Sequence, residues 1–333
     1  MSKLLVTGGV GYVGSHLVHY LVKEKNISPA NILVFDKSAR EHSNILPDGV
    51  TVFAGDLRNF KDISRVFIDY EIDGVIHLAG MLNVAESMKQ PGDYFDNNVV
   101  GGLNLLRAMA SSVCRVIVFS SSCTVYGNAL SPVSEGATCL PISPYGESKL
   151  QFEKMLEWYG RAHGFKAISL RYFNAAGAFY GIGEAHVPEI HLIPSILSSL
   201  VSGQEFVVYG NDYSTSDGTC VRDYVHVRDL ASAHAKSLEY LQTASPGLEV
   251  FNLGSGQGVS VREVVGIAER VTGLHVDLHY SPRRPGDAEK MIADSKKANE
   301  ILRWHPLHTI ENCIEDAWEW LKKQKGLDSE QRG

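Results

Sequence analysis

The stretch Leu4-Leu5-Val6-Thr7-Gly8-Gly9-Val10-Gly11-Tyr12-Val13-Gly14 decides the fold class of this chain. Its apolar run leads into a glycine-rich turn, and an amphipathic stretch follows. Glycines without Cβ atoms allow a tight turn and let the backbone approach a pyrophosphate at the N-terminus of a helix. Asp36 ends the next apolar run, 22 residues after Gly14, near the spacing of about 20 residues for an acid that binds a ribose. The pattern predicts a dinucleotide site, and Asp36 favours NAD over NADP because a carboxylate repels a 2′-phosphate.

Short apolar runs recur through the first two-thirds of the chain, separated by helical patterns. The runs that we expect to form strands are 32–35, 50–53, 75–78, 116–119 and 167–170. Continuous β-branched runs of this length are typical of strands buried on both faces of a parallel sheet, and their alternation with helices gives βαβ units. The sequence therefore predicts an α/β fold with a Rossmann-type doubly wound parallel sheet.

The pattern changes after Asn174. Residues 175–224 are rich in Gly, Ser, Asp and Tyr, whereas 225–255 return to the earlier alternation. We expect 1–174, together with 225–255, to form the NAD-binding Rossmann domain. A smaller C-terminal α/β lobe for the substrate is expected to consist mainly of 175–224 and 256–333.

The composition excludes several classes of protein. The 333 residues carry a formal net charge of −7, which disfavours a general nucleic-acid binder because duplex binding needs clustered cations. The five cysteines are an odd number without a C-x-x-C pair, so no disulfide framework is expected. The glycines of the opening segment interrupt any signal peptide or membrane span. We expect a soluble cytoplasmic protein with neither a nucleic-acid nor a membrane partner.

A second motif carries the candidate chemistry. Tyr145 and Lys149 are four residues apart in an amphipathic stretch after Pro144, so both lie on one helical face. A nearby ammonium stabilises a phenolate, and we expect Tyr145 to act as a base below its ordinary pKa of about 10. The serine-rich segment 119–127 follows a strand at the edge where open α/β sheets place ligands. A hydroxyl from that segment can relay a proton to Tyr145.

These motifs and others along nearly the whole chain resemble those of the extended short-chain dehydrogenase/reductases, and within them the UDP-glucose 4-epimerases. The matching segments are Thr7–His16, Gly55–Leu57, His77–Gly80, Glu86–Ser87, Asp96–Val99, Ser120–Gly127, Ser143–Lys149, Leu170–Asn174, Gly210–Tyr213, Asp217–Asp229, Asn252–Val261 and Pro282–Asp287. The first of these are typical of the superfamily, and the later ones are typical of nucleotide-sugar epimerases. The resemblance implies an isomerase that interconverts UDP-galactose and UDP-glucose by transient oxidation at sugar C4, with tightly bound NAD and a non-stereospecific return of the hydride.

The resemblance also implies roles for individual residues. The expected catalytic residues are Ser122, Tyr145 and Lys149. The expected cofactor-binding residues are Gly8, Gly11, Tyr12, Val13, Gly14, Asp36, Lys37, Asp56, Leu57, Leu78, Ala79, Gly80, Asn97, Ser120, Tyr145, Lys149 and Tyr172. The expected substrate-binding residues are Ser122, Thr124, Tyr145, Asn174, His191, Leu192, Tyr209, Arg222, Tyr224, Arg284, Asp287 and Met291. Asn174 and the two arginines would hold the UDP diphosphate, since a guanidinium fork matches phosphate oxygens.

Two positions bear on how closely the chain follows this family. Leu82 stands where relatives commonly have Lys, which removes one expected polar contact to the cofactor. Met291 stands where bulky aromatic residues exclude N-acetyl sugars and small residues admit them, so acceptance of N-acetylated UDP-hexoses is left open. Family members commonly pair helices as homodimers, including the helix that bears Tyr145, and a homodimer is expected.

Other functions remain as alternatives. A sugar 4,6-dehydratase usually carries an Asp-Glu pair directly after the catalytic hydroxyl, where this chain has Cys123 and Thr124. A UDP-N-acetylglucosamine or UDP-glucuronate 4-epimerase is a closer alternative, and a non-catalytic NAD-sensing regulator would usually lack the Tyr or the Lys. No metal site is predicted, because His275 and His279 fall in a segment that alternates like a strand.

Overall fold

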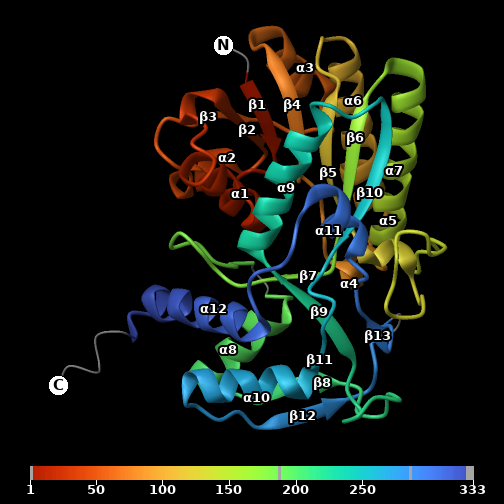
Figure 1. Cartoon of the computed structure of the whole chain (residues 1–333). Helices are drawn as coiled ribbons and strands as arrows, with labels where there is room; N and C mark the ends of the chain where they lie inside the picture. Colours follow the sequence, from red (N-terminus) through yellow and green to blue (C-terminus); the bar gives the residue numbers. More distant parts are fainter. Residues whose placement is uncertain (1–2, 187–188, 285–286, 328–333) are drawn as a thin grey trace.

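The computed structural model describes residues 3–186, 189–284 and 287–327. Figure 1 shows two lobes, with the N-terminal strands and helices in the upper one and α8, α10 and α12 in the lower one. None of the helices in these described ranges is long and apolar enough to cross a membrane.

The upper lobe is built on a seven-stranded sheet in which every pairing is parallel. Its strands are β1 (Lys3–Thr7), β2 (Ile32–Asp36), β3 (Thr51–Ala54), β4 (Ile72–His77), β5 (Val116–Ser122), β6 (Lys166–Tyr172) and β10 (Gly247–Leu253). The spatial order β10-β6-β5-β4-β1-β2-β3 reverses direction at β1. This arrangement confirms the predicted Rossmann-type sheet, and it opens a crevice at the carboxyl ends of β1 and β4.

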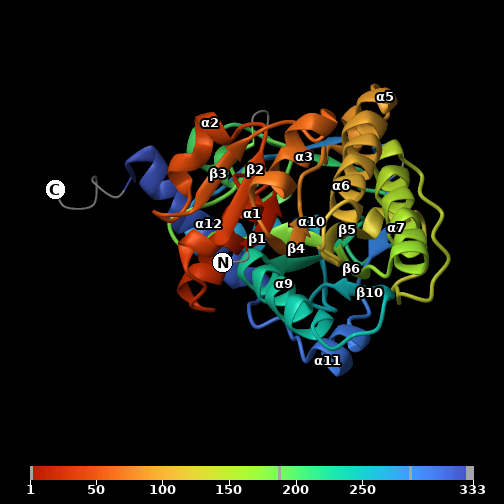
Figure 2. The same cartoon turned by 90° about the horizontal axis from the view of Figure 1, so that it is seen from above.

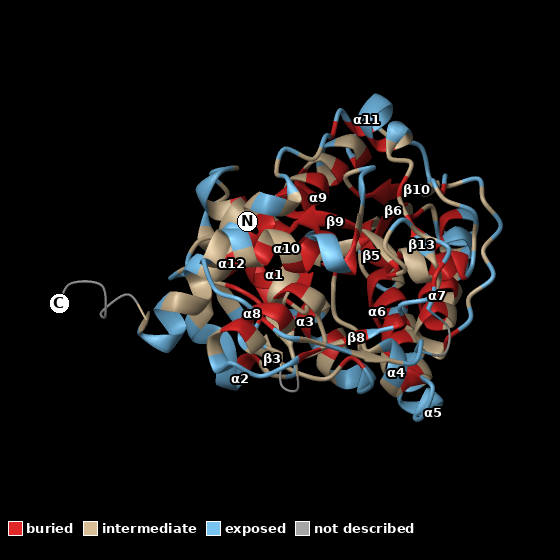
Figure 3. Ribbon diagram, turned by 90° about the horizontal axis from the view of Figure 1, so that it is seen from below, coloured by how far each residue is buried: buried red, intermediate tan, exposed pale blue. Residues whose placement is uncertain are grey.

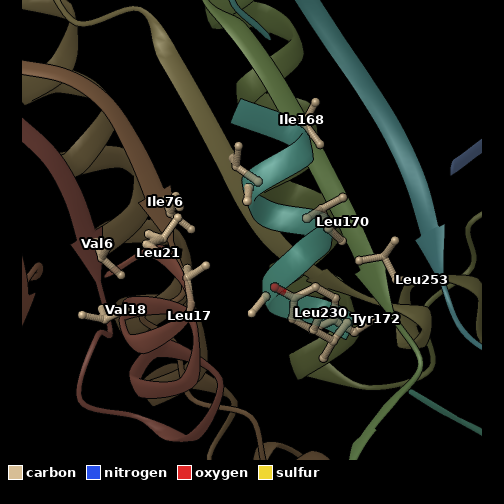
Figure 4. Close-up of a cluster of buried hydrophobic side chains, with 14 of the residues drawn as sticks. Val6, Leu17, Val18, Leu21, Ile76, Ile168, Leu170, Tyr172, Leu230 and Leu253 are labelled. Carbon is tan, nitrogen blue, oxygen red and sulfur yellow. The ribbon is translucent and has the colours of Figure 1, made fainter. Parts of the chain in front are cut away.

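Helices cover both faces of this sheet (Figure 2). On one face lie α1 (Tyr12–Lys23) and α9 (Val227–Leu241), and on the other lie α3 (Phe60–Asp69), α6 (Gly101–Ala110) and α7 (Pro144–His163). Successive strand residues point to opposite faces, so Val6 packs with Leu17 of α1 (Figure 4) whereas Leu5 packs with Leu105 of α6. Burial of each such side chain stabilises the folded state by roughly 1.5–3 kcal/mol.

Short segments complete the upper lobe. They are α2 (Ala39–His42), α4 (Val84–Ser87), α5 (Pro91–Tyr94), α11 (Lys296–Leu302) and the 3₁₀ turns Pro29–Asn31, Ser43–Ile45 and Cys123–Tyr126. A π-helical turn, Phe95–Val100, joins α5 to α6 and contains Asn97. Such turns occur frequently at functional sites.

The lower lobe has its own sheets and its own core. Its strands are β7 (Asn174–Ala176), β8 (Phe206–Tyr209), β9 (Val221–His226), β11 (Gly258–Ser260), β12 (Leu278–Ser281) and β13 (Lys290–Met291). Strands β7 and β13 run parallel to β9, β11 runs antiparallel to it, and β12 pairs with β8 in parallel. Apolar residues of α8 (Leu192–Ser202), α10 (Val261–Thr272) and α12 (Ile310–Lys325) pack together, and Figure 3 shows buried segments within a more exposed periphery.

Local caps determine where the important helices begin and end. Ser143 caps α7 by accepting a hydrogen bond from the Gly146 amide at 3.2 Å, and Pro144 occupies the first helical position. Gly164 ends the same helix with a φ of +69°. Ser260 and Glu263 form a reciprocal capping box at the start of α10. The cap of α7 places Tyr145 in the first turn of that helix.

The strand expected around His275 and His279 is shorter than its alternation suggests. Strand β12 begins only at Leu278, so it includes His279 but not His275. The His275 side chain is 79% exposed and lies 2.6 Å from the carboxylate of Glu269. His275 is therefore in contact with Glu269 near the end of α10 and is not paired in a strand.

Candidate active site

The glycine turn after β1 is shaped by close backbone contacts. Gly8 has a φ of +75°, and a Cβ there would lie 2.5 Å from the Ala79 nitrogen. A Cβ on Gly14 would lie 2.1 Å from the Gly8 oxygen. No side chain in the described chain caps α1 at Gly11, so the first N–H groups of the helix remain available to an anion. The turn therefore fits a pyrophosphate, as the sequence predicts.

Acidic side chains follow the next two strands at the same edge of the sheet. Asp36 ends β2, and its carboxylate accepts from the Ser38 amide at 2.9 Å and the Val10 amide at 3.4 Å. Asp56 follows β3 and forms an ion pair with Arg58 at 2.7 Å. The hydrogen bond from Arg58 lowers the pKa of Asp56 below its ordinary value. Both aspartates are thus oriented at the edge where the ribose and base of a dinucleotide would lie.

The loop after β4 forms the next wall and is held by Asn98. The Asn98 carbonyl oxygen accepts from the Met81 amide at 2.8 Å, and its amide group donates to Ser148 of α7 at 2.9 Å. A Cβ on Gly80 would lie 3.3 Å from both the Asn98 oxygen and the Lys149 nitrogen. The family resemblance assigns Asn97, but not its neighbour Asn98, to the cofactor. Asn98 lies in the matching segment Asp96–Val99, and the structure shows that its side chain is almost fully buried.

The expected catalytic residues converge from β5 and α7. The Ser122 hydroxyl oxygen, at the end of β5, accepts from the Thr124 hydroxyl at 2.9 Å. Ser122 also acts to lower the pKa of the Tyr145 phenol. The Lys149 ammonium donates to the Ser120 carbonyl at 2.8 Å and lies 5.8 Å from the centre of the Tyr145 ring. A hydroxyl, a phenol and an ammonium are therefore adjacent, which is the arrangement that proton transfer needs.

The pKa values in this group differ from the sequence expectation in one respect. Desolvation raises the pKa of Tyr145 to about 12, against a smaller lowering by the Ser122 hydrogen bond. The expected lowering by Lys149 is not found, since the ammonium is directed at the Ser120 carbonyl. Burial lowers the pKa of Lys149 to about 8. Without further positive charge in the cleft, Tyr145 is protonated at neutral pH.

The second wall of the site comes from the lower lobe. Arg222 on β9 lies 3.3 Å from the Asp287 carboxylate, and the Arg284 guanidinium lies 4.0 Å from the centre of the Tyr209 ring. The neighbouring segment Pro282–Asp287 includes Pro285 and Gly286, which lie outside the described residues. Met291 is buried on β13 and pairs with Arg222 in the sheet register.

Asn174 and His191 also lie on this wall. The side-chain amide of Asn174 donates to the Asp223 carbonyl at 2.8 Å. His191 is the N-terminal cap residue of α8, which starts at Leu192. The hydrogen bond of Asn174 and the start of α8 at His191 therefore lie where the two lobes meet.

All these elements line one cleft between the lobes. Its volume is about 1420 Å³, and each residue that the sequence analysis assigned to catalysis, cofactor or substrate lies on its wall. Leu82 also lines the cleft, and its side chain offers the cofactor an apolar contact where a Lys would offer a charge. The structure therefore brings the predicted site residues together on one cleft wall, and their roles stay predictions.

Comparison with known proteins identifies the family. The model of the NAD dependent epimerase/dehydratase family matches residues 4–254. The chain belongs to this family. It is 43% identical over 325 residues to the UDP-glucose 4-epimerase of Halalkalibacterium halodurans, and the match covers 96% of each chain.

Solved structures agree with this assignment over the full fold. A crystal structure of a UDP-glucose 4-epimerase has a TM-score of 0.91 and 39% identity, covering 97% of this chain and 98% of that one. The UDP-glucose 4-epimerase from Bifidobacterium longum, in complex with NAD+ and UDP, has a TM-score of 0.89 and 35% identity, covering 97% and 99%. The predicted family and fold are confirmed.

Proposed function

We propose that this chain interconverts UDP-galactose and UDP-glucose, with NAD held in the upper lobe and the UDP-sugar held mainly by the lower lobe. The observation that carries the proposal is the single cleft, in which Ser122, Tyr145 and Lys149 lie between the glycine turn and the Arg222–Asp287 pair. The relatives at 39–43% identity are UDP-glucose 4-epimerases along their whole length.

The upper lobe has the residues that NAD requires. The uncapped N-terminus of α1 and the glycine turn would hold the pyrophosphate, and Asp36 would accept from a ribose hydroxyl. Lys149 would contact the nicotinamide ribose of NAD, next to Ser122 and Tyr145. When bound, the oxidised cofactor supplies the hydride acceptor for sugar C4 and a positive charge beside the phenol.

Protein side chains would accept the proton of the sugar 4′-hydroxyl and later return it. In this scheme the Tyr145 oxygen accepts the proton, directly or through the Ser122 hydroxyl. The Lys149 ammonium, which is mostly protonated at pH 7 because its pKa is about 8, would add positive charge near the phenolate once the bound ligands bring the two groups into closer contact. The pKa of about 12 at Tyr145 means that proton removal depends on positive charge being present in the cleft.

The lower lobe would anchor the nucleotide and leave the sugar ring free. Arg222 and Arg284 would contact the diphosphate, Tyr209 would stack on the uracil and Asp287 would accept from the ribose of UDP. Anchoring at the diphosphate holds the oxidised sugar without fixing its ring, so either face can be presented for the return of the hydride. The contact between Arg222 and Asp287 at 3.3 Å keeps both side chains oriented at the site where a polar ligand would bind.

The residues after Ser122 disfavour dehydration. Burial raises the pKa of Cys123 to about 12, so its thiol is a poor acid or base at neutral pH. The Thr124 hydroxyl donates to Ser122. Neither side chain replaces the Asp-Glu pair that a sugar 4,6-dehydratase uses.

A homodimer is part of this proposal. Helix α7 exposes 63% of Trp158 at the surface. Phe152 and Leu156, by contrast, are fully buried against the sheet of their own chain, and Met155 and Tyr159 pack beside them. Trp158 is therefore the residue on which pairing of α7 with a second copy would rest.

The test is to incubate the purified protein with UDP-galactose without added NAD and to separate the UDP-hexoses. We expect UDP-glucose to form in the wild type. Tyr145→Phe should lower kcat by about 10²–10⁴-fold while UDP-glucose still binds, because general acid-base catalysis contributes factors of that size.

The matched control is Tyr94→Phe, which changes a neighbouring buried tyrosine whose ring centre lies 6.4 Å from that of Tyr145. Its hydroxyl donates to the Asn83 carbonyl and has no part in the proposed proton transfer. Wild-type turnover by Tyr145→Phe would contradict the assignment. A parallel incubation with UDP-N-acetylgalactosamine determines which sugars the Met291 position admits.

A further inference from the structure

The segment between β7 and α8 brings one carboxylate and two imidazoles together. One ligand atom from each of Glu184, His186 and His191 lies within 4.8 Å of the others. The Glu184 Oε2 atom is 3.5 Å from the Nδ1 atom of His191, and the Nδ1 atom of His186 is hydrogen-bonded to Glu184 Oε1. The centres of the two imidazole rings are 5.4 Å apart. The carboxylate thus lies between two imidazole nitrogens.

The Glu184 carboxylate is buried and incompletely satisfied. Its side chain is 4% exposed, and within the described residues Oε2 accepts no hydrogen bond. The distance of 3.5 Å to His191 is long for a hydrogen bond. A buried carboxylate oxygen without a donor is costly, and a bound cation would satisfy it.

A second carboxylate stands beside the same imidazole. The Glu189 Oε1 atom is 3.2 Å from His191 Nδ1 and also accepts from the His191 amide at 2.7 Å. The backbone bond fixes this carboxylate next to the cluster. Glu189 therefore orients the His191 imidazole and lies outside the group of three ligand atoms.

Two imidazole nitrogens with a carboxylate oxygen are a donor set that suits zinc among the divalent metals. Tetrahedral zinc with bonds of about 2.0–2.1 Å places its ligand atoms about 3.3–3.5 Å apart, which matches the Glu184–His191 distance of 3.5 Å. We propose that Glu184, His186 and His191 bind one zinc ion. The site does not include Ser122, Tyr145 or Lys149, but it lies in the same cleft and uses His191, which the family resemblance assigns to the substrate.

The place of the cluster in the fold indicates what a zinc ion would do. His191 caps the N-terminus of α8, and all three ligand residues line the wall of the interlobe cleft. A zinc ion would tie the preceding segment to the first turn of α8. It would hold this part of the cleft wall in place and would have a structural role.

The test measures zinc binding directly and does not depend on turnover. The full-length protein is freed of metal with a chelator and dialysed, and zinc sulfate is then titrated by calorimetry with the zinc content measured by mass spectrometry. We expect one zinc per chain and a rise in Tm, because a ligand that binds only the folded state stabilises it. Glu184→Gln and His186→Ala should each weaken zinc binding by about 100-fold or more, since even partners outside the ligand set contribute 10–100-fold.

The matched control is His275→Ala. This exposed histidine also lies beside carboxylates, at 2.6 Å from Glu269 and 3.7 Å from Asp277, yet it is outside the proposed site, so its loss should leave zinc binding unchanged. Circular dichroism checks that each variant is folded. The His186 side chain is 38% exposed, so His186→Ala decides the question even if Glu184→Gln does not fold. A wild type without stoichiometric zinc, or a folded His186→Ala variant that binds zinc as the wild type does, would overturn the proposal.

Discussion

Lys149 shows how a single residue can trade stability for chemistry. Its side chain is buried, with its ammonium between the Ser120 carbonyl at 2.8 Å and the face of Phe119, whose ring centre is 4.9 Å away. Burial lowers its pKa to about 8, although Glu153 acts in the opposite direction. Strongly perturbed groups in a cleft are typical of functional sites. An ammonium with no functional role would be more stable exposed to water than buried in this cleft.

The lowered pKa of Lys149 predicts that the free energy of unfolding depends on pH. The folded state binds this proton more weakly than the unfolded state, so stability rises with pH between about 8 and 10.4, and the full cost applies below pH 8. A shift of this size corresponds to about 3 kcal/mol. Lys149→Met in the cofactor-free protein should gain about 2 kcal/mol at pH 7, because the lost Ser120 hydrogen bond offsets about 1 kcal/mol. Urea unfolding at pH 7 and pH 9.5 measures this difference.

The control for this prediction is an exposed lysine on the same helix. Lys154 of α7 is exposed, so Lys154→Met should give no comparable gain. If the advantage of Lys149→Met does not shrink as the pH rises, the ammonium is not held below its ordinary pKa. The variant should also lose turnover, which would show stability and activity moving in opposite directions.

At the residue scale, sequence reasoning succeeded where a motif keeps its residues close together in the chain. Tyr145 and Lys149 share one turn of α7, so helical geometry alone places them together. It could not predict the pKa of Tyr145, which burial raises to about 12, because desolvation depends on every element around the cleft. Nor could it predict that Glu184 approaches two histidines, because the sequence around Glu184 has no apolar periodicity that would place these side chains together.

At the scale of elements, the turn from β1 to α1 holds the least replaceable contacts of the site. A Cβ on Gly14 would meet the Gly8 oxygen at 2.1 Å and the Gly9 Cα at 2.8 Å. Both are backbone atoms, which cannot rotate away as a flexible side chain can. The tight turn and the exposed helix N-terminus thus depend on the same glycine.

Gly14→Ala should therefore destabilise the protein by about 3 kcal/mol, near the upper end of ordinary overpacking, and should reduce bound NAD. The matched control is Gly92→Ala in α5, where a Cβ would meet nothing within 4 Å. That change should be neutral or stabilising by up to about 1 kcal/mol, since alanine favours a helix. Thermal unfolding and the NAD content of the purified proteins measure both effects. Equal NAD content in Gly14→Ala and the wild type would exclude this role for the turn.

The elements of the upper lobe were easier to predict from the sequence than those of the lower lobe. Buried parallel strands such as β5 are continuous apolar runs, which the sequence displays directly. The lower lobe contains strands as short as β13, with two residues, and β12 takes its place only by pairing with β8, about seventy positions earlier in the chain. Such pairings depend on tertiary contacts and leave little local signal.

At the scale of the whole molecule, the cleft explains how a chain with a net charge of −7 can suit anionic ligands. In the function proposed above, the anion sites would be local, because one would use the N-terminus of α1 and the other would use Arg222 and Arg284. Electrostatic complementarity over a few ångströms does not depend on the total charge. Since the two sites lie on different lobes, the relative placement of the lobes sets the distance between cofactor and sugar.

The homodimer proposed above is testable at this scale. Trp158 is 63% exposed on α7 and lies under the Arg161 guanidinium, 5.0 Å from the ring centre. Tryptophan and arginine are the residues that most often dominate binding energy at interfaces, with losses of at least about 2 kcal/mol on truncation. Sedimentation of the wild type at micromolar concentration should give the mass of two chains, and Trp158→Glu should shift it towards one.

The control for the interface is Ile68→Glu on α3, which changes an apolar side chain that is 80% exposed on a different helix. We expect this variant to remain a dimer, because the loss of an exposed apolar residue outside the interface changes only local hydration. A wild type that sediments as a single chain would refute the dimer. A dimer that survives Trp158→Glu with unchanged affinity would place the interface on another surface, since burial of a carboxylate at the centre of an apolar contact is strongly unfavourable.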